Sequence, residues 1–377
     1  MNNISLYIHI PFCHKAKCLY CDFVSFCGQE KQIDGYVSAL CREFSLYKKT
    51  LSNSTVSTIF IGGGTPSLLS THQIKKIFVS LSKNFVISKN AEITIECNPE
   101  SIKEDRLKCY KALGINRLSL GCQTMNDSVL SLIGRQHRKK HFEKALALSQ
   151  KYFDNINVDM MIGLPSQSLN DVMSMAEYLV QKGIPHISAY SLMLEEKTPL
   201  CALVSKGEIK LPSDDQTVKM YDKLSKYLAQ NGIKRYEVSN FALKGKECLH
   251  NLNYWTMGEY IGFGVAAHSY FEGKRFCNTS SMQEYIDRLS LATLPIDSSE
   301  TLSNEQTREE YIMLSLRTKW GINLAKYKEM FGASILDQKR KEIDMLLSQK
   351  LVKLTPSTLS LTSKGYHVLN AVVLSLC

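Results

Sequence analysis

The chain has 377 residues, 44% of them hydrophobic and 22% charged, and a net charge of +10 at neutral pH. These values are typical of a globular protein and exclude a disordered or low-complexity chain. No apolar run approaches the roughly 18 residues that a membrane-spanning helix needs, and the N-terminus lacks the pattern of a signal peptide. We therefore expect a cytoplasmic protein whose 12 cysteines are thiols or metal ligands rather than disulfides.

The positive charge is compatible with an anionic partner, such as nucleic acid, a membrane surface or a polycarboxylate ligand. It is weak evidence, because the densest basic stretch, residues 135–144, is equally typical of a solvated helix face. Peripheral membrane association therefore stays open as an expectation.

Short β-branched runs alternate with segments of helical periodicity over residues 5–190. Apolar residues at Val37, Leu40, Phe44 and Tyr47, for example, have the spacing of one buried helix face. This alternation predicts an α/β fold with a parallel sheet of six strands, curved into an open, partial (βα)6 barrel. The predicted strands cover residues 6–10, 58–61, 92–96, 117–120, 157–162 and 186–191.

Cysteine, glycine and polar residues follow the carboxyl ends of five successive predicted strands. In parallel sheets, the loops that leave these ends build the active site. Chance would scatter such residues over both ends of the sheet, so the sequence predicts one pocket at this rim. The segments are residues 13–21, 62–66, 96–99, 121–123 and 159–165.

The pattern loosens beyond residue 200. A helix near residues 217–228 and a strand-like run at 234–238 precede a loop-rich segment at 248–264. From about residue 301, three helices, two short strands at 351–354 and 358–361, and a final helix are expected. Helices followed by a small two-stranded wing predict a C-terminal winged-helix-like α+β domain.

Three cysteines, Cys13, Cys18 and Cys21, lie within nine residues directly after the first predicted strand. Their neighbours include Lys15 and Lys17, which a buried core position would not tolerate unpaired. Thiolates converging from one short loop suit a four-iron cluster, on which three cysteines leave one iron free for a substrate or cosubstrate. The alternatives are buried core cysteines, a disulfide pair, or a zinc site whose fourth ligand would be His9, His14 or Cys27.

The second predicted strand ends in Gly62-Gly63-Gly64-Thr65-Pro66. Residues without Cβ let the backbone approach a ligand closely and expose amide donors. A tight structural turn explains a glycine triplet equally well. Beside the cysteine loop, however, the glycines would suit a ligand whose amino acid moiety chelates the open iron.

These motifs together resemble the radical S-adenosylmethionine superfamily. More narrowly, the chain resembles the oxygen-independent coproporphyrinogen III oxidase family and, within it, the haem chaperone branch. The resemblance implies a radical S-adenosylmethionine core at 1–200, a family-specific extension at 201–300 and the C-terminal domain at 301–377. It rests on residues 7–13, 94–99, 116–123, 134–137, 157–159, 163–165, 186–191 and 236–242.

By this resemblance, Cys13, Cys18 and Cys21 would bind a [4Fe-4S] cluster. Glutamate and aspartate can accept hydrogen bonds from ribose hydroxyls or an ammonium group, and arginine can pair with a carboxylate. Taken singly, each of these side chains could instead be a helix cap or a surface charge. The residues implied to contact S-adenosylmethionine are Tyr7, Gly63, Gly64, Thr65, Glu96, Gln123, Arg135 and Asp159.

The chain departs from the family pattern at two places. Four residues separate Cys13 from Cys18, where the family has three, so the loop is expected to bulge by one residue. Val265-Ala266 replaces the usual Pro-Gly pair, and we expect the loop there to sit differently.

Further motifs distinguish the haem chaperone branch of this family from its coproporphyrinogen III dehydrogenases. Phe23 stands where the dehydrogenases tend to have a fourth cysteine, and the chain begins almost directly at its first strand, without their N-terminal extension. The run His250-Asn251-Leu252-Asn253-Tyr254-Trp255 resembles the signature of the haem chaperone branch. An exposed His250 beside aromatic rings could ligate haem iron, with Cys248 as the alternative ligand. The structural alternative is that His250 and Asn251 cap a turn and Trp255 belongs to the core.

The sequence therefore favours a scaffold that binds haem and passes it to an acceptor protein. The second hypothesis is an oxygen-independent coproporphyrinogen III dehydrogenase. The third is a nucleic-acid-binding winged-helix protein, which is disfavoured because the wing segment at 354–358 lacks lysine and arginine.

Overall fold

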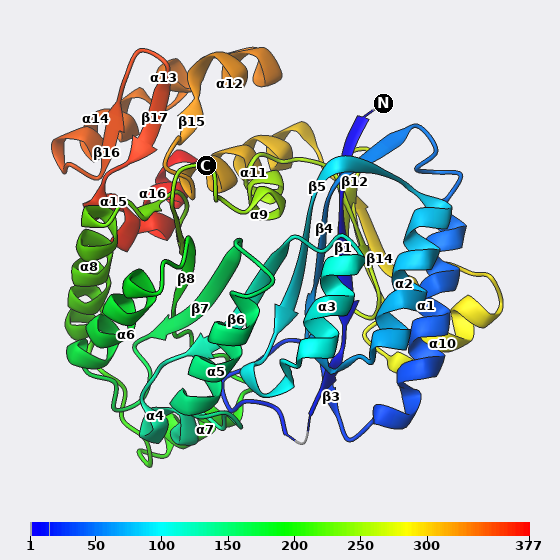
Figure 1. Cartoon of the computed structure of the whole chain (residues 1–377). Coiled ribbons are helices and arrows are strands. Elements are labelled where there is room, and N and C mark those ends of the chain that lie inside the picture. Colours follow the sequence, from blue (N-terminus) through cyan, green and yellow to red (C-terminus); the bar gives the residue numbers. More distant parts are fainter. Residues whose placement is uncertain (1, 15) are drawn as a thin grey trace.

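The structure is a computed structural model and describes residues 2–14 and 16–377. Its central feature is a curved sheet whose six middle strands all run parallel, in chain order from one side to the other. The predicted six-stranded barrel core is thereby confirmed (Figure 1). These strands are β1 (Asn2–Ile10), β4 (Ser54–Gly63), β5 (Val86–Cys97), β6 (Arg117–Gln123), β7 (Ile156–Ile162) and β8 (His186–Ser191).

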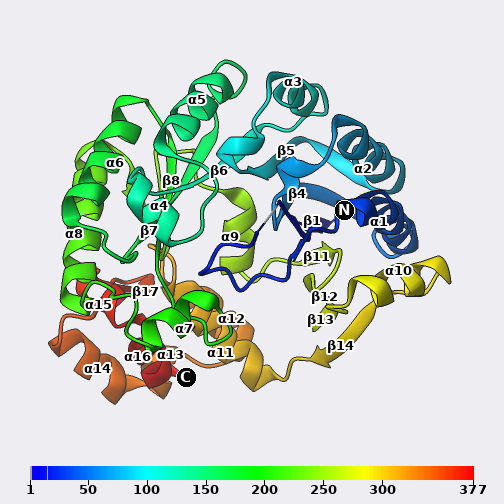
Figure 2. The ribbon, with the colours of Figure 1, turned by 90° about the horizontal axis from the view of Figure 1, so that it is seen from below.

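Amphipathic helices cover the outer face of this sheet, and Figure 2 shows them as an arc around the strands. The longest helix in the described part of the chain has 17 residues, and no helix there combines the length and apolar character that crossing a bilayer requires. The covering helices are α1 (Ile33–Tyr47), α2 (Thr71–Asn84), α3 (Glu104–Ala112), α5 (Lys139–Ser149), α6 (Leu169–Gln181) and α8 (Asp214–Gln230), whereas the short α4 (Asp127–Leu132) lies inside this arc, next to β7.

The segment between residues 201 and 300 extends both edges of the same sheet. On one edge, β11 pairs in parallel with β1 and is followed by three antiparallel strands; on the other, β10 and β9 continue antiparallel from β8. The sequence predicted a loop-rich region at 248–264, which is wrong, because helix α9 and strand β11 lie there. The strands are β9 (Lys234–Arg235), β10 (Asn240–Ala242), β11 (Tyr260–Phe263), β12 (His268–Phe271), β13 (Lys274–Asn278) and β14 (Ile296–Thr301), and the helices are α7 (Pro199–Ser205), α9 (Leu249–Trp255) and α10 (Met282–Ser290).

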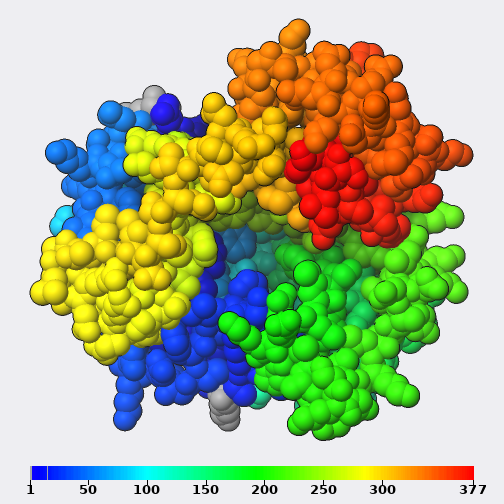
Figure 3. All heavy atoms as spheres, turned by 180° about the vertical axis from the view of Figure 1, so that it is seen from behind, coloured from blue at the N-terminus to red at the C-terminus, as the bar shows by residue number. Residues whose placement is uncertain are grey.

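The C-terminal part forms a second core with its own three-stranded sheet, in the order β15-β17-β16. Seen from behind, it is the orange and red lobe in Figure 3. The predicted wing corresponds to β16 (Val352–Leu354) and β17 (Thr358–Leu361), and β15 (Ile322–Asn323) is an additional strand. This confirms an α+β domain of winged-helix type. Its helices are α11 (Asn304–Leu316), α12 (Leu324–Phe331), α13 (Ile335–Gln338), α14 (Arg340–Ser348), α15 (Ser363–His367) and α16 (Leu369–Leu376).

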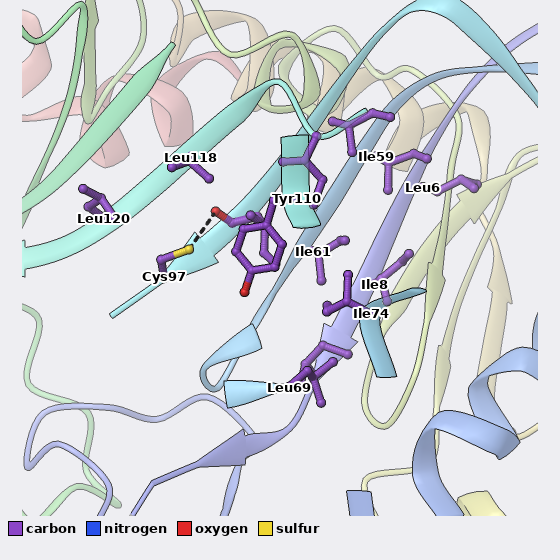
Figure 4. Close-up of a cluster of buried hydrophobic side chains, with 14 of the residues drawn as sticks. Leu6, Ile8, Ile59, Ile61, Leu69, Ile74, Cys97, Tyr110, Leu118 and Leu120 are labelled. Atoms are coloured by element: carbon purple, nitrogen blue, oxygen red, sulfur yellow. Dashed lines mark hydrogen bonds between the residues drawn. The ribbon is translucent and has the colours of Figure 1, made fainter. Parts of the chain in front are cut away.

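Side-chain alternation along the strands separates an apolar outer face from a functional inner face. Leu6 and Ile8 of β1 are fully buried in the main hydrophobic core, together with Ile59 and Ile61 of β4 (Figure 4). Because successive side chains on a strand point to opposite faces, Tyr7 is directed to the inner side of the curved sheet. The hydrophobic pattern thus fixes which residues face the barrel interior.

The departure at Val265-Ala266 lies in the connection between β11 and β12. Ala266 has a φ of 56°, in the left-handed region that L-residues avoid, at the place where the family usually has glycine. Hydrogen bonds hold the turn on both sides, from the Ala266 amide to Thr279 O and from the Asn278 amide to Ala267 O, each at 2.9 Å. The chain therefore keeps the turn and accepts backbone strain at one alanine.

We expect Ala266→Gly to raise the free energy of unfolding by about 0.5–1 kcal/mol, because relief of the strain exceeds the entropic cost of glycine. Thermal unfolding monitored by circular dichroism measures the change. The matched control is Ala267→Gly, in which a buried alanine outside the left-handed region loses its Cβ, and which should lower stability. Equal destabilisation by both substitutions would contradict the strain at Ala266.

Candidate functional site

The cysteine loop, residues 13–27, leaves the carboxyl end of β1. Its two ends are joined by β2 (Phe12–Cys13) and β3 (Phe26–Cys27), a short parallel pair that places Cys13 opposite Cys27. Lys15, within the predicted one-residue bulge, lies outside the described residues. The strand pairing closes the loop at its base and leaves the segment with Cys18 and Cys21 at its tip.

The tip of the cysteine loop is held by one hydrogen bond to the end of helix α4 and by one within the loop. The Leu19 amide donates to Ile133 O at 3.1 Å, and the Cys21 amide donates to Cys18 O at 3.1 Å. Burial, with smaller contributions from the thiols of Cys18 and Cys13, raises the pKa of the Cys21 thiol to about 11 against the opposing effects of a Phe23 backbone hydrogen bond and Lys17.

Within the described residues, no group of three or more His, Cys, Asp or Glu side chains is arranged around a single ion. A four-iron cluster takes each thiolate on a different iron, so its cysteines need not meet at one point. The cysteine loop therefore fits a cluster, and the assignment of Cys13, Cys18 and Cys21 as its ligands stays a prediction.

The glycine run at the end of β4 is packed against the start of the cysteine loop. Gly63 has a φ of 113°, and a Cβ there would lie 2.6 Å from the His9 ring; a Cβ on Gly64 would lie 2.6 Å from Phe12 O. The Gly64 amide donates to Ile10 O at 2.9 Å. In this structure the glycines let the ends of β1 and β4 approach each other closely. This agrees with the alternative that the glycine triplet serves a tight structural turn.

Two carboxylates face the barrel from strands on either side of β6, Glu96 near the end of β5 and Asp159 in the middle of β7. Glu96 of β5 accepts a hydrogen bond from the Gly63 amide at 3.1 Å, and Asp159 of β7 accepts from Asn157 Nδ2 at 2.7 Å and Ser119 Oγ at 3.1 Å. Burial and the charge of Asp159 raise the pKa of Glu96 to about 8, and burial raises the pKa of Asp159. A buried acidic pair of this kind suits a cationic ligand, and S-adenosylmethionine carries sulfonium and ammonium groups.

Arg135 links the cysteine loop to the strand ends. Its guanidinium donates to Gly121 O at 2.6 Å and to Asn98 Oδ1 at 2.9 Å, and it lies 3.6 Å from Cys18 Sγ. Asn98 in turn donates to Thr65 Oγ1 at 3.0 Å. The buried Nε of Arg135 has no partner among the described residues, so the guanidinium retains a donor for an anionic group.

Tyr7 and Gln123 complete the predicted set. The Tyr7 hydroxyl is 2.9 Å from His9 Nδ1, and burial raises the pKa of Tyr7, with a smaller contribution from Glu96. Gln123 has a φ of 68° at the end of β6, where the chain turns towards α4. Six of the eight predicted S-adenosylmethionine contacts thus lie at or next to the rim, whereas Tyr7 and Asp159 come from within β1 and β7; the roles of all eight stay predictions.

His250 does not lie at this rim. It belongs to α9, which Figure 2 shows within the ring of strands, and its side chain is 1% exposed. Its ring nitrogens are hydrogen-bonded, Nδ1 with Thr58 Oγ1 at 2.7 Å and Nε2 with the Tyr254 hydroxyl at 2.8 Å. Burial lowers its pKa to about 3. The expectation of an exposed imidazole is therefore wrong. The structural alternative is not borne out in detail either, because His250 and Asn251 lie inside helix α9 rather than capping a turn, and Trp255 is half-buried outside the hydrophobic core clusters.

Sequence reasoning missed the carboxylate that fixes His250. Glu92 of β5, just after the register shift in its pairing with β4, accepts hydrogen bonds from the amides of Leu249 at 3.1 Å and His250 at 3.0 Å. An acidic group at a helix N-terminus stabilises the helix. No sequence signal connects residues so far apart in the chain.

Asn98 was also missed as a site residue, although it belongs to a quoted motif. It joins Arg135 to Thr65 and lies directly after β5. Its position at a strand end was the signal that could have found it. Ser119 and Asn157, which orient Asp159, lie inside strands and carried no such signal.

Comparisons with known proteins decide the family. The sequence pattern of the Radical SAM superfamily matches residues 7–179, and that of the HemN C-terminal domain matches residues 302–368. The chain is 35% identical to a protein named heme chaperone HemW from Bacillus subtilis, covering 98% of this chain and 97% of that protein. This chain belongs to the HemW family.

A second HemW-family relative, from Mycobacterium tuberculosis, is 33% identical and covers 98% of this chain and 94% of that protein. Among solved structures, coproporphyrinogen III oxidase (HemN) from Escherichia coli aligns with a TM-score of 0.87 at 22% identity, covering 100% of this chain and 90% of that one. The HemW-family chain therefore shares the HemN fold throughout. The predicted family resemblance is confirmed.

Because the pKa of Glu96 is raised in the folded state, the free energy of unfolding should decrease as pH rises. The folded state holds this proton up to about pH 8, whereas the unfolded carboxyl ionises near its ordinary pKa of 4.5. Ionisation therefore increasingly favours unfolding as pH rises from about 5 to 8. In ligand-free protein, Glu96→Gln should become more stable than wild type across this range, by about 1–2 kcal/mol after solvent screening.

Urea unfolding of both proteins at a series of pH values measures this difference. The matched control is Glu177→Gln on the exposed face of α6, which should leave the pH dependence of wild type unchanged. A constant difference between Glu96→Gln and wild type at all pH values would refute the raised pKa.

Proposed function

We propose that this chain is a haem chaperone on a radical S-adenosylmethionine scaffold, which binds haem and transfers it to an acceptor protein. The observation that carries this proposal is full-length similarity to several proteins named heme chaperone HemW. Phe23 supports it, because this residue stands in place of the fourth cysteine of the dehydrogenases and is 63% exposed within the cysteine loop.

Cys13, Cys18 and Cys21 would hold the [4Fe-4S] cluster. When bound, the cluster and S-adenosylmethionine would supply one-electron chemistry at the open iron. Glu96 and Asp159 would face the positive charge of the cosubstrate, and that charge would in turn favour ionisation of Glu96. The guanidinium of Arg135 lies between the Cys18 sulfur and the rim. Its unpartnered Nε would donate a hydrogen bond to the carboxylate of the cosubstrate.

The proposal also includes the compartment in which the protein works and the surface at which haem would reach the acceptor protein. A cluster held in a partly exposed loop needs a reducing compartment, so we assign the protein to the cytoplasm, with all 12 cysteines free. The net charge of +10 supports a peripheral encounter with an anionic membrane surface, where a membrane-bound acceptor of haem would be reached.

Anaerobic reconstitution with iron and sulfide tests the cluster. Wild type should turn brown, with broad visible absorbance and a paramagnetic resonance signal after reduction, and Cys18→Ala should lose most of both. Cys41→Ala is the matched control, because this free thiol lies on α1, away from the cysteine loop, and should behave as wild type. Equal cluster content in wild type and Cys18→Ala would overturn the ligand assignment.

Incubation of the reconstituted protein with coproporphyrinogen III, S-adenosylmethionine and a reductant separates chaperone from dehydrogenase. We expect no protoporphyrinogen, whereas haem added under the same conditions should bind and then move to an apo-haem acceptor. Product analysis by chromatography measures the first reaction, and the Soret band of the acceptor measures the second. Robust turnover of coproporphyrinogen III would replace the proposed function by the dehydrogenase.

A further inference from the structure

The segment that contains helices α1 and α2 carries almost purely basic charge. Between residues 35 and 91 the chain has seven lysine or arginine residues and one acidic residue, Glu43, so this segment supplies six of the ten net positive charges. Glu43 is fully buried and accepts hydrogen bonds from Tyr285 and Asn278, each at 2.6 Å, so its charge is not presented at the surface. The basic residues are Arg42, Lys48, Lys49, Lys75, Lys76, Lys83 and Lys89, and all of them are exposed.

Three of these lysines, Lys48, Lys49 and Lys83, line one hollow of about 670 Å³, which we call the basic hollow. Lys48 and Lys49 directly follow α1, and Lys83 lies in the last turn of α2. The two helices lie side by side, and Figure 1 shows the loops that follow them at the end of the barrel opposite the cysteine loop. The basic hollow is therefore separate from the predicted S-adenosylmethionine site.

The protein does not neutralise the charge of the basic hollow. None of the seven basic residues forms an ion pair with an acidic side chain in the part of the chain that the structure describes. The dipole of a helix favours cations at its C-terminal end, which explains why lysines are tolerated there. An anion bound in the hollow would in addition relieve the repulsion between the three ammonium groups.

The other polar side chains of the basic hollow are already engaged. Ser45, Ser52 and Ser82 donate to backbone carbonyl groups of α1, its C-terminal end and α2, at 2.7–2.8 Å. Asn84 donates to Ser80 O at 2.8 Å. Mobile ammonium groups, rather than a fixed array of hydroxyl and amide donors, would therefore hold the anion. This suits a charged headgroup better than a ligand that needs directional hydrogen bonds.

Exposed aliphatic side chains flank the lysines. Val86 lines the basic hollow and is 52% exposed, and Val79, one turn before Lys83 on α2, is 67% exposed. Basic residues beside exposed apolar ones are typical of a surface that lies at the boundary between lipid headgroups and acyl chains. Surfaces that bind single-stranded nucleic acid instead present aromatic rings for stacking, and the aromatic residue of this hollow, Phe85, is buried.

We propose that the basic hollow binds the phosphate headgroup of an anionic phospholipid and is the surface by which the protein reaches a membrane. This inference rests on the membrane encounter in the proposed function. Lysines close to an anionic bilayer add their electrostatic attractions, and Val79 and Val86 would enter the boundary below the headgroups. With this end of the barrel on the membrane, the cysteine loop at the opposite end would stay accessible to S-adenosylmethionine from the aqueous side.

Flotation with phospholipid vesicles tests the basic hollow in the full-length protein. Wild type should bind vesicles of phosphatidylcholine with phosphatidylglycerol, but not vesicles of phosphatidylcholine alone, and added salt should weaken the binding. The triple variant with Lys48→Gln, Lys49→Gln and Lys83→Gln should bind about thirtyfold more weakly. The matched control combines Lys219→Gln, Lys223→Gln and Lys226→Gln, which remove the same charge from exposed lysines of α8, and it should bind nearly as wild type.

Tryptophan fluorescence gives a second measurement that does not depend on removing charge. Val86→Trp places a fluorophore at the basic hollow, and its emission should shift to shorter wavelengths when anionic vesicles are added. Val218→Trp is the control, because Val218 is 38% exposed on α8 and its emission should stay unchanged. Unchanged emission of Val86→Trp while the protein floats with the vesicles would refute this surface.

The outcomes separate this inference from the proposed function. Absence of vesicle binding by wild type would overturn the inference and the membrane encounter, whereas transfer of haem is tested independently by the acceptor assay. Equal weakening in the two triple variants would overturn only the assignment of the hollow, because binding would then follow net charge. Stronger competition by inorganic phosphate than by chloride at equal ionic strength would assign the hollow to a free phosphate ligand. Tighter binding of single-stranded RNA than of anionic vesicles would assign it to nucleic acid, and either result would refute the inference.

Discussion

The parallel pairing of β1 with both β4 and β11 is the constraint on which the rest of the structure depends. This pairing puts β1 within the sheet, so that its even-numbered side chains are buried against helices and its odd-numbered ones enter the barrel. It also brings the carboxyl end of β1 to the same rim as the ends of β4 to β7. The cysteine loop can therefore meet residues more than 100 positions away in the chain.

The backbone segments pack closely at this rim because glycine residues there have no Cβ atom. Glycines at the end of β4 let the strand approach His9 and Phe12, and buried hydrogen bonds then connect one strand end to the next. Arg135, Asn98 and Thr65 form one such chain of contacts. A rim built in this way is rigid before any ligand arrives, which reduces the entropy that binding must overcome.

The two ends of the barrel differ in chemical character. The carboxyl end carries the acidic pair and the cysteine loop, whereas α9 lies among the strands and is held by Glu92 and Thr58 near the opposite end. The recognisable motif around His250 therefore has a structural explanation: it places a short helix within the barrel. The cavity of about 610 Å³ beside the cysteine loop is lined by Tyr254 of this motif together with residues from distant parts of the chain.

The sequence alone determined the six parallel strands, the C-terminal wing and the rim of strand ends that carries Cys13 and Glu96; Arg135 was assigned to the site only through the family resemblance. It could do so because alternation and strand-end position are local properties of the chain. Only the tertiary structure decided that His250 is buried, that β11–β14 extend the sheet, and that Lys48, Lys49 and Lys83 line one hollow. Burial and the availability of a side chain depend on packing between segments far apart in the chain, which local patterns do not encode.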